Sequence, residues 1–283
     1  MKRIVVISGK GGTGKTVLSA ALVSLMKNGV AVDCDVDASN LHLLLAPDIR
    51  REEEFRFGET ARINRDLCDS CGRCRSVCRF DAISEHDEID PVFCEGCGAC
   101  ALACPRNAVE MTENVSGRWF ISETRFGPFV HARLDAGEEN SGKLVSYVKQ
   151  KADELAQERS ASVQIIDGSP GIGCPVIASL AGVNQALIVT EPTVSGLHDA
   201  RRVITLARHF QIPVQVVINK YDLNPEMAQT IEVFCRDESI PLAGKIAFDP
   251  SVVSSMIAGQ TLMEGASAQI RQAVREIWES VAG

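Results

Sequence analysis

The segment that most constrains this chain is Gly9-Lys10-Gly11-Gly12-Thr13-Gly14-Lys15-Thr16, which stands between an apolar run and a helical pattern. It fits G-x-x-x-x-G-K-[ST], a pattern that requires a strand before it and a helix after it. In that setting backbone N–H groups surround phosphate oxygens, the lysine adds charge at the β- and γ-phosphates, and the hydroxyl binds Mg²⁺. A glycine-rich turn that only caps a helix would need neither Lys15 nor Thr16. The expected nucleotide-binding residues of this loop are Gly11, Gly12, Thr13, Gly14, Lys15 and Thr16.

Lys10 directly follows the first glycine, so the loop reads K-G-G-T-G-K-T. This loop resembles the deviant phosphate-binding loop of the superfamily that includes MinD, Mrp and the nitrogenase iron protein. The resemblance implies a nucleotide-sandwich dimer, formed by two identical chains or with a paralogous ATPase. Lys10 would then be catalytic from the other subunit, much as an arginine finger is. A solvated loop lysine is the alternative for Lys10.

Acidic residues follow an apolar run at 30–33, which is expected to be a strand. The carboxyl ends of parallel strands lie beside such a loop, where carboxylates can hold a Mg²⁺ water or orient an attacking one. In the resembled superfamily this segment is switch I, which makes Asp35 the water-activating residue and a Mg²⁺ ligand, with Asp37 the next candidate. Asp33 and Asp37 serve equally well as polar loop caps.

A second apolar run, 163–166, ends in Asp167 and is followed by a glycine-rich segment. This is the D-x-x-x-G arrangement that the superfamily uses as Walker B and switch II. The resemblance implies that Asp167 holds Mg²⁺ through water and that the Gly171 N–H senses the γ-phosphate.

Eight of the eleven cysteines fall between residues 68 and 104, in two runs of C-x₂-C-x₂-C-x₃-C. This is the paired spacing of a bacterial two-cluster ferredoxin. In the resembled fold the first three cysteines of each run bind three irons of one [4Fe–4S] cluster, and the fourth cysteine crosses to the other cluster. The expected ligand sets are Cys68, Cys71, Cys74 and Cys104 for the first cluster and Cys94, Cys97, Cys100 and Cys78 for the second.

Two details qualify the cysteine pattern. Arg79 stands where the first run usually has proline, which would change a turn or a local hydrogen bond without removing a ligand. Zinc is the competing metal, but eight thiolates in a symmetric repeat are typical of ferredoxins rather than of zinc sites with histidine ligands. Metal-ligand spacing also fits a reducing compartment better than disulfides do.

Strands and helices alternate along the rest of the sequence, which predicts an α/β fold with a doubly wound, mostly parallel sheet and right-handed crossovers. The cysteine-rich segment at 61–113 is expected to form an inserted, small α+β ferredoxin-like domain. The ATPase domain would then be discontinuous, comprising 1–60 and 114–283. Residues 46–60 lose apolar periodicity and are expected to be surface strand or linker.

Later elements are predicted from turns and helical periodicity. An antiparallel strand pair is expected around Phe126-Gly127-Pro128, and a helix that Asn140 or Ser141 caps is expected to run to about Arg159. Three further helices are expected at about 194–210, 225–238 and 266–281. The last is amphipathic, but Glu276 and Glu279 dilute its basic face, so packing on the sheet is favoured over membrane attachment.

Asn219 and Lys220 follow an apolar strand at the place where the superfamily reads the base. Asn219 is expected to hydrogen-bond the purine, and Phe248, Asp249 and Pro250 lie on a loop that resembles the adenine-packing wall. The same strand end, through Asp222, also matches the N-K-x-D of guanine-specific proteins. The subclass of the phosphate loop favours ATP over GTP.

Cys174 has the spacing from Asp167 at which the nitrogenase iron protein carries a ligand of its subunit-bridging cluster. No second cysteine occupies the corresponding earlier position. A buried structural thiol is therefore the expected role of Cys174, as of Cys34 and Cys235.

Composition excludes several classes of protein. The 283 residues suffice for one large core and a smaller module, and no apolar run approaches the roughly 18 residues that span a bilayer. The N-terminus begins directly with an expected strand and leaves no room for a signal peptide, so we expect a cytoplasmic protein without stable membrane insertion. A net charge of −8 disfavours a general nucleic-acid binder, which needs a basic face.

These features predict an ATP-binding and ATP-hydrolysing iron–sulfur dimer with Mg²⁺ and two [4Fe–4S] clusters. Nucleotide state would gate electron transfer from the clusters to a metalloprotein partner. The alternatives are an Mrp-type carrier of metal clusters and a MinD-like spatial regulator with structural or sensory clusters. The C-x-x-C acceptor that Mrp-like proteins carry near the C-terminus is absent from this sequence, which disfavours the carrier.

Overall fold

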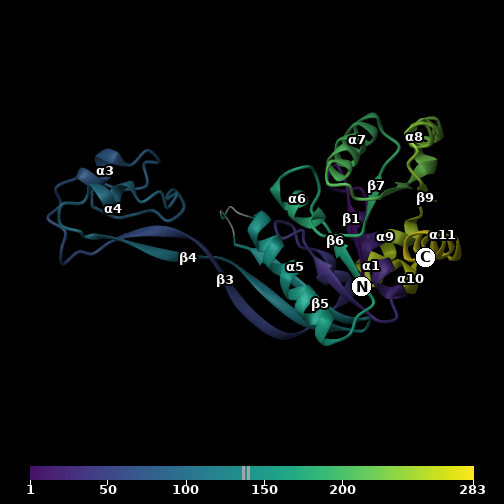
Figure 1. Cartoon of the computed structure of the whole chain (residues 1–283), viewed down its shortest axis with the longest axis horizontal. Coiled ribbons are helices and arrows are strands. Elements are labelled where there is room, and N and C mark those ends of the chain that lie inside the picture. Colours follow the sequence, from purple (N-terminus) through teal and green to yellow (C-terminus); the bar gives the residue numbers. More distant parts are fainter. Residues whose placement is uncertain (136–137, 139–140) are drawn as a thin grey trace. The chain divides into compact units, whose positions relative to one another are not determined.

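The computed structural model describes residues 1–135, 138 and 141–283. The chain divides into two compact units, which are treated separately here (Figure 1). The larger comprises Met1–Glu53, Trp119–Arg133 and Ser141–Gly283, and the smaller comprises Glu54–Arg118 and Leu134–Asn140. Two long strands, β3 (Asp48–Ile63) and β4 (Val109–Thr124), run from one unit into the other along the chain.

A nine-stranded sheet has the order β3-β4-β5-β2-β6-β1-β7-β8-β9. Every pair from β5 to β9 in this order is parallel, which confirms the mostly parallel sheet. The chain enters at a central strand and later returns to both sides of it, which is the doubly wound arrangement. The remaining strands are β1 (Lys2–Ile7), β2 (Gly29–Asp33), β5 (Gly127–Leu134), β6 (Val163–Asp167), β7 (Gln185–Thr190), β8 (Val214–Asn219) and β9 (Leu242–Ile246).

Helices occupy most of the crossovers between the strands. The helices of the larger unit are α1 (Lys15–Leu25), α2 (Leu41–Leu45), α5 (Ser141–Glu158), α6 (Cys174–Leu180), α7 (Val194–His209), α8 (Pro225–Asp237), α9 (Pro250–Ile257), α10 (Leu262–Gly265) and α11 (Ala268–Ala282). A short 3₁₀ turn, η1 (Tyr221–Leu223), precedes α8. The smaller unit holds α3 (Arg73–Val77) and α4 (Ala99–Ala103).

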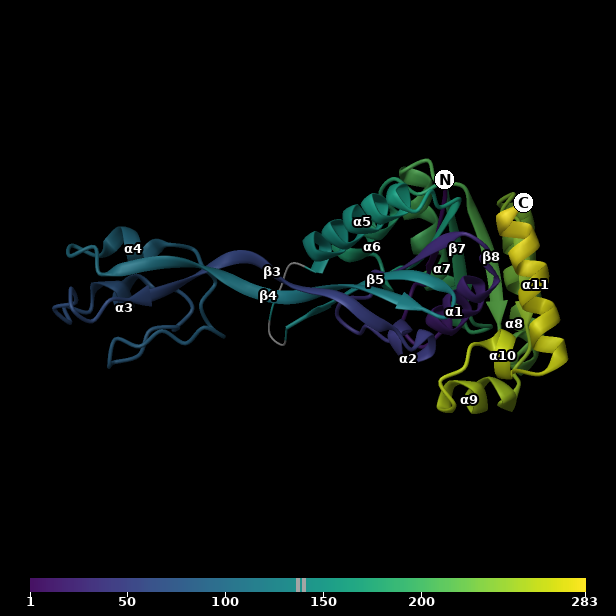
Figure 2. The ribbon, with the colours of Figure 1, turned by 90° about the horizontal axis from the view of Figure 1, so that it is seen from below.

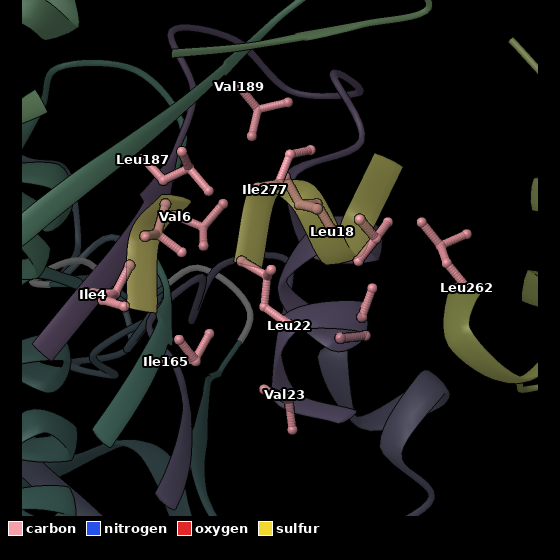
Figure 3. Close-up of a cluster of buried hydrophobic side chains, with 14 of the residues drawn as sticks. Ile4, Val6, Leu18, Leu22, Val23, Ile165, Leu187, Val189, Leu262 and Ile277 are labelled. Atoms are coloured by element: carbon pink, nitrogen blue, oxygen red, sulfur yellow. The ribbon is translucent and has the colours of Figure 1, made fainter. Parts of the chain in front are cut away.

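One face of the sheet is closed by α1, α2, α10 and α11. Figure 3 shows the core on this side, where Ile4 and Val6 of β1 meet Leu18 and Leu22 of α1 and Ile277 of α11. Side chains alternate along a strand, so the buried Val5 and Ile7 face the opposite side. There α5, α6, α7 and α8 contact β2, β1, β7 and β8 respectively.

The amphipathic C-terminal helix packs on the sheet, as expected from its sequence. Four side chains at helical spacing on α11 are buried, and the helix contacts β9 and α1. Figure 2 shows α11 as the long yellow helix of the larger unit. The buried residues are Ile270, Val274, Ile277 and Val281. Within the described part of the chain, no helix is both long and apolar enough to cross a bilayer.

The segment expected to be surface strand or linker is a regular strand. β3 runs for 16 residues, and Phe55 and Ala61 are its buried side chains. Apolar periodicity is weak because most of its side chains are exposed, and the strand forms through pairing with β4. Helix α5 begins at Ser141; the other expected cap, Asn140, lies outside the described residues.

Candidate functional site

The phosphate loop connects β1 to α1 and curls at two glycines with positive φ. Gly12 has φ 80° and Gly14 has φ 87°, values that only glycine adopts without strain. A Cβ built on Gly11 or Gly12 would meet nothing within 4 Å, so the inside of the loop is open. The buried Thr13 Oγ1 has no hydrogen-bond partner among the described residues. An open cradle beside an unpaired hydroxyl fits an anionic ligand.

Gly14 offers a direct test of this loop. An added Cβ would collide with the Asn219 side-chain nitrogen, which donates to the Thr13 carbonyl at 2.8 Å, and it would also force a left-handed backbone on alanine. We expect Gly14→Ala to lower the free energy of unfolding by about 1–2 kcal/mol and to weaken nucleotide binding. Gly11→Ala is the control: its Cβ meets nothing, so urea unfolding should show no destabilisation, and a destabilised Gly11→Ala would contradict the explanation.

Lys15 lies at the centre of a buried charge cluster at the carboxyl ends of β2 and β6. Its Nζ is 3.0 Å from Asp167 Oδ1 and 3.4 Å from Asp35 Oδ2, and its side chain is 6% exposed. Burial alone would lower the pKa of Lys15, but the nearby Asp167, Asp35 and Asp33 carboxylates outweigh it and hold that pKa above its usual value. Lys15 is therefore a permanent cation here.

Asp167 is held by three partners from α1. The Thr16 hydroxyl donates to Asp167 Oδ2 at 2.7 Å, and the Ser19 hydroxyl donates to Asp167 Oδ1 at the same distance. With Lys15 these contacts fix a buried carboxylate next to the helix start. Carboxylate and hydroxyl oxygens are the ligands that Mg²⁺ prefers, so Thr16 and Asp167 are suited to share one ion.

The three switch I carboxylates differ in their surroundings. Asp33 is fully buried and caps its own loop, accepting from the Ser39 hydroxyl at 2.8 Å and from the Asp35 N–H at 3.0 Å. Burial and the Asp167 carboxylate raise the pKa of Asp33 to about 7, although Lys15 opposes the shift. Burial also raises the pKa of Asp35, with Lys15 again opposing. Asp37 is exposed, so Asp35 alone of the expected pair faces Lys15.

Lys10 is held by residues that follow β7. Its Nζ is 3.7 Å from Glu191 Oε2 and 3.4 Å from the Ser195 hydroxyl, while Lys220 Nζ is 2.7 Å from Glu191 Oε1. Glu191 thus sits between two lysines that both lie near the phosphate loop. Lys10 must leave this position to act on a nucleotide bound elsewhere.

Of the residues expected to contact the nucleotide base, some lie near the phosphate loop and the end of β8, and others form the start of a helix. Asn219 is turned towards the phosphate loop, and the Phe248 N–H donates to Asp222 Oδ1 at 2.7 Å, which places Phe248 near the end of β8. Phe248 is 47% exposed and available to stack on a base. Asp249 instead caps α9, with its carboxylate accepting from the Ser251 N–H and the Ser267 hydroxyl, and Pro250 begins that helix. The expected loop wall is therefore partly a helix start.

The expected γ-phosphate sensor is engaged in this structure. The Gly171 N–H donates to the Ser8 carbonyl at 2.9 Å, although a Cβ at Gly171 would meet open space. Sensing a phosphate would require this hydrogen bond to break.

Two residues of this site were missed by sequence reasoning. Ser19 lies four residues after Lys15, a spacing that places both on the same face of a helix, so it could have been identified from periodicity. Glu191 directly follows β7, and the rule that placed Asp35 at a strand end would also have found it.

The eight paired cysteines of the smaller unit surround two cavities. Cys78, Cys94, Cys97 and Cys100 line one of them. Cys68, Cys71, Cys74 and Cys104 line the other. Each cavity thus receives three cysteines of one run and the fourth cysteine of the other.

The two cysteine runs have the same local backbone, which explains the matched cavities. Gly72 and Gly98 precede α3 and α4 with φ 70° and 72°, and Asp81 and Asn107 have φ 51° and 49°. The central thiols of the runs, Cys74 and Cys100, are buried in one apolar cluster together with Ala61, Ile83 and Val109. Within the described segments, no group of three or more His, Cys, Asp or Glu side chains is placed to hold a single metal ion.

The other three cysteines differ from one another. Cys34 and Cys235 are buried, as expected, and burial raises the pKa of the Cys34 thiol to about 12. Cys174 was expected to be buried but is exposed, because it is the first residue of α6 and follows the open segment that contains Gly171.

A glycine loop between a central parallel strand and a helix, with a lysine, a hydroxyl and two carboxylates converging on it, defines a nucleotide-binding domain of the phosphate-loop class. The chain belongs to the CobQ/CobB/MinD/ParA nucleotide-binding domain family, which it matches over residues 4–262.

Known proteins resemble the chain over most of its length. It is 36% identical to the uncharacterized protein MJ0578 of Methanocaldococcus jannaschii over 283 residues, covering 99% of this chain and 96% of the relative. It is 28% identical to the septum site-determining protein MinD of Synechocystis, covering 93% and 82%. The solved structure of MinD with Mg-ADP from Pyrococcus horikoshii aligns with a TM-score of 0.60 at 20% identity, covering 99% of this chain and 96% of that chain. The last similarity shows the shared fold.

Proposed function

We propose that this chain is a MinD-like ATPase that holds two [4Fe–4S] clusters in its smaller unit. The observation that carries the ATPase part is the meeting of Lys15, Thr16, Asp35 and Asp167 at one edge of the sheet. Family membership and relatives named MinD along almost the whole chain support it. The experiment is hydrolysis of ATP and GTP by anaerobically purified protein, with ATP expected to be preferred.

The residues of the site have distinct roles in this proposal. The open loop at Gly11 and Gly12 binds phosphate oxygens through N–H groups, and Lys15 neutralises the charge that develops on them. Thr16 and Asp167 hold Mg²⁺, which supplies a positive charge that polarises the phosphate oxygens. Asp35, the remaining carboxylate beside Lys15, orients the attacking water.

Lys10 is proposed to act across a dimer, as in the superfamily that the loop resembles. We expect Lys10→Ala to leave ATP affinity within about threefold and to lower the hydrolysis rate by at least about 10²-fold, since one charge on the transition state is removed. The measurements are fluorescent-nucleotide binding and phosphate release at several protein concentrations. Hydrolysis that is unaffected by Lys10→Ala and independent of protein concentration would contradict the dimer.

Two cavities that each gather four cysteines in the crossed pattern support the iron–sulfur part. Zinc would bring four sulfurs to about 2.3 Å from one point, whereas a cubane spreads its ligands around a larger volume. Burial raises the pKa of the Cys74 and Cys100 thiols, so loading would release protons as thiolates form. Iron, acid-labile sulfide and the EPR spectrum of the reduced protein test this part.

Two outputs of the nucleotide switch remain as candidates. Relatives named MinD favour a spatial regulator whose clusters are structural or sensory. The paired cavities favour electron transfer gated by ATP, because two clusters in one small unit form a route for electrons. Stopped-flow oxidation of the reduced clusters separates them: gated transfer requires rates that differ between ATP, ADP and no nucleotide. Localisation that depends on ATP but not on iron would favour the regulator.

A further inference from the structure

Three arginines are exposed on and directly after helix α3, at the end of the first cysteine run. Arg73, Arg75 and Arg79 are all exposed, and no ion pair joins them to another described residue. The equivalent positions of the second cysteine run are Ala99, Ala101 and Pro105. The two halves of the smaller unit share a backbone but not a surface charge, so the arginines are not needed to form the fold.

Compensation of cluster charge explains at most one of these arginines. Arg73 lines the cavity of Cys68, Cys71, Cys74 and Cys104, but Arg75 and Arg79 line neither cavity. The second cysteine run forms its cavity without a guanidinium at the equivalent positions. The cysteine sites therefore do not require Arg75 and Arg79.

No described carboxylate forms an ion pair with these arginines, although the exposed Asp81 lies two residues after Arg79. No acidic residue occurs between Cys71 and Phe80. Of the carboxylates that line the adjacent cavity, Asp69 is paired with Arg106 at 3.0 Å and Asp87 is 7% exposed. This positive surface differs in sign from the chain as a whole, whose net charge of −8 would repel acidic molecules.

We propose that the surface formed by Arg73 and Arg75 of α3 and by Arg79, two residues beyond its end, is the docking surface for an acidic redox protein. The inference rests on the proposed clusters, because Cys74 of α3 lines one cavity and Cys78, which directly follows the helix, lines the other. A partner bound on α3 lies next to both sites at which an electron could enter or leave. One electron would pass between a reduced cluster and the oxidised cofactor of the partner, with no bond formed or broken.

Apolar side chains beside the arginines favour a protein over a membrane or a nucleic acid as the partner. Val77 is 37% exposed and Phe80 is 42% exposed. Arginine together with aromatic side chains is typical of protein interfaces. Three charges within seven residues are fewer than the long basic face that nucleic acids require. Charge and apolar contact together fit a protein surface with exposed carboxylates.

The test compares two variants with equal charge loss. Each replaces three exposed basic residues by alanine: Arg73, Arg75 and Arg79 in one, and Lys27, Arg236 and Arg275 of the larger unit in the other. The probe is a plant-type [2Fe–2S] ferredoxin with an acidic surface, titrated onto the full chain at low and moderate salt. We expect the α3 variant to lose about tenfold in affinity at low salt, since three exposed ion pairs are removed, and the control variant to lose less than about twofold.

Further measurements separate the possible outcomes. The iron content of the α3 variant must match that of wild type. If the variant lost iron, its weaker binding of ferredoxin would be explained by damaged clusters and not by the missing arginines. Replacing all three arginines by lysine should retain most of the affinity, since long-range charge is kept. Equal losses in the α3 and control variants, no binding of the ferredoxin by wild type, or preferential binding of phosphatidylserine vesicles would each overturn the docking proposal. Iron loading tests the clusters independently of all three.

Discussion

Lys15→Ala is expected to lower ATP hydrolysis by at least about 10²–10³-fold, the loss typical when a group that stabilises the transition state is removed. Lys15→Ala should also lower the free energy of unfolding of the nucleotide-free protein. Lys15 is the cation that balances the buried Asp167 and Asp35 carboxylates, and breaking a buried pair costs about 3–5 kcal/mol. Phosphate release and urea unfolding measure the two effects.

The destabilisation has a defined pH dependence. Burial already raises the pKa of Asp33 to about 7 and raises that of Asp35, and loss of Lys15 would raise both further. A carboxyl group whose folded-state pKa exceeds its unfolded value is stabilised as pH falls, so lowering the pH from about 8 to about 6 should recover part of the lost stability. Added Mg²⁺ should also recover part of it by restoring positive charge.

Lys10→Ala is the matched control, because it removes the same charge from the same loop. Lys10 is about one-third exposed, and its Glu191 partner keeps a shorter ion pair with Lys220, so its loss should change stability by less than about 0.5 kcal/mol. If Lys15→Ala unfolded at the same urea concentration as Lys10→Ala, the buried charge cluster would not be balanced by Lys15 as described.

The fold was predictable from sequence where apolar periodicity is strong. The buried strands β1, β6 and β7 read as apolar runs, and the helix bounds expected at 194–210 and 225–238 differ from α7 and α8 by one residue. The sequence left β3 open as surface strand or linker, because an exposed strand has few apolar side chains and depends on pairing with a neighbour. Long-range pairing of that kind leaves little trace in the local sequence.

The candidate site was predictable in its members but not in its contacts. Strand ends and loop chemistry identified Lys15, Asp35 and Asp167, whose meeting follows from parallel topology. The restraint of Lys10 by Glu191 and the capping role of Asp249 could not be predicted, since both depend on side-chain directions fixed by tertiary packing. The expected burial of Cys174 was wrong. It was inferred from the lack of a second cysteine for a bridging cluster, whereas the position of Cys174 as the first residue of α6 leaves it exposed.

The proposed nucleotide site and the proposed iron–sulfur sites lie in different units of this chain. In the proposed function, nucleotide in the larger unit acts on the Gly171 and Asp35 segments, and both segments follow strand ends of that unit. The smaller unit has its own apolar cluster around the cysteines. Cluster loading and nucleotide binding should therefore be separable by mutation, which makes each proposal testable without the other.

Two double variants provide the sharpest test of the cysteine sites, since one removes two thiols of a single cavity and the other removes one thiol from each cavity. Cys68 and Cys104 line one cavity, so C68A/C104A should leave the other set complete and retain about four of about eight irons. Cys68 and Cys78 line different cavities, so C68A/C78A should damage both sets and retain far fewer. Iron, acid-labile sulfide and EPR after anaerobic reconstitution measure the outcome.

Comparing the iron content of the two double variants distinguishes the crossed from the uncrossed assignment of cysteines to clusters, because the uncrossed assignment predicts the opposite result. If each run of four cysteines held its own cluster, C68A/C78A would keep about half the iron and C68A/C104A would lose most of it. Cys174→Ala is the control, since Cys174 is exposed and lines neither cavity, and its iron content should equal that of wild type. Zinc in place of iron in the wild-type protein would contradict the clusters themselves, whereas equal iron in the two double variants would contradict the crossed cavities.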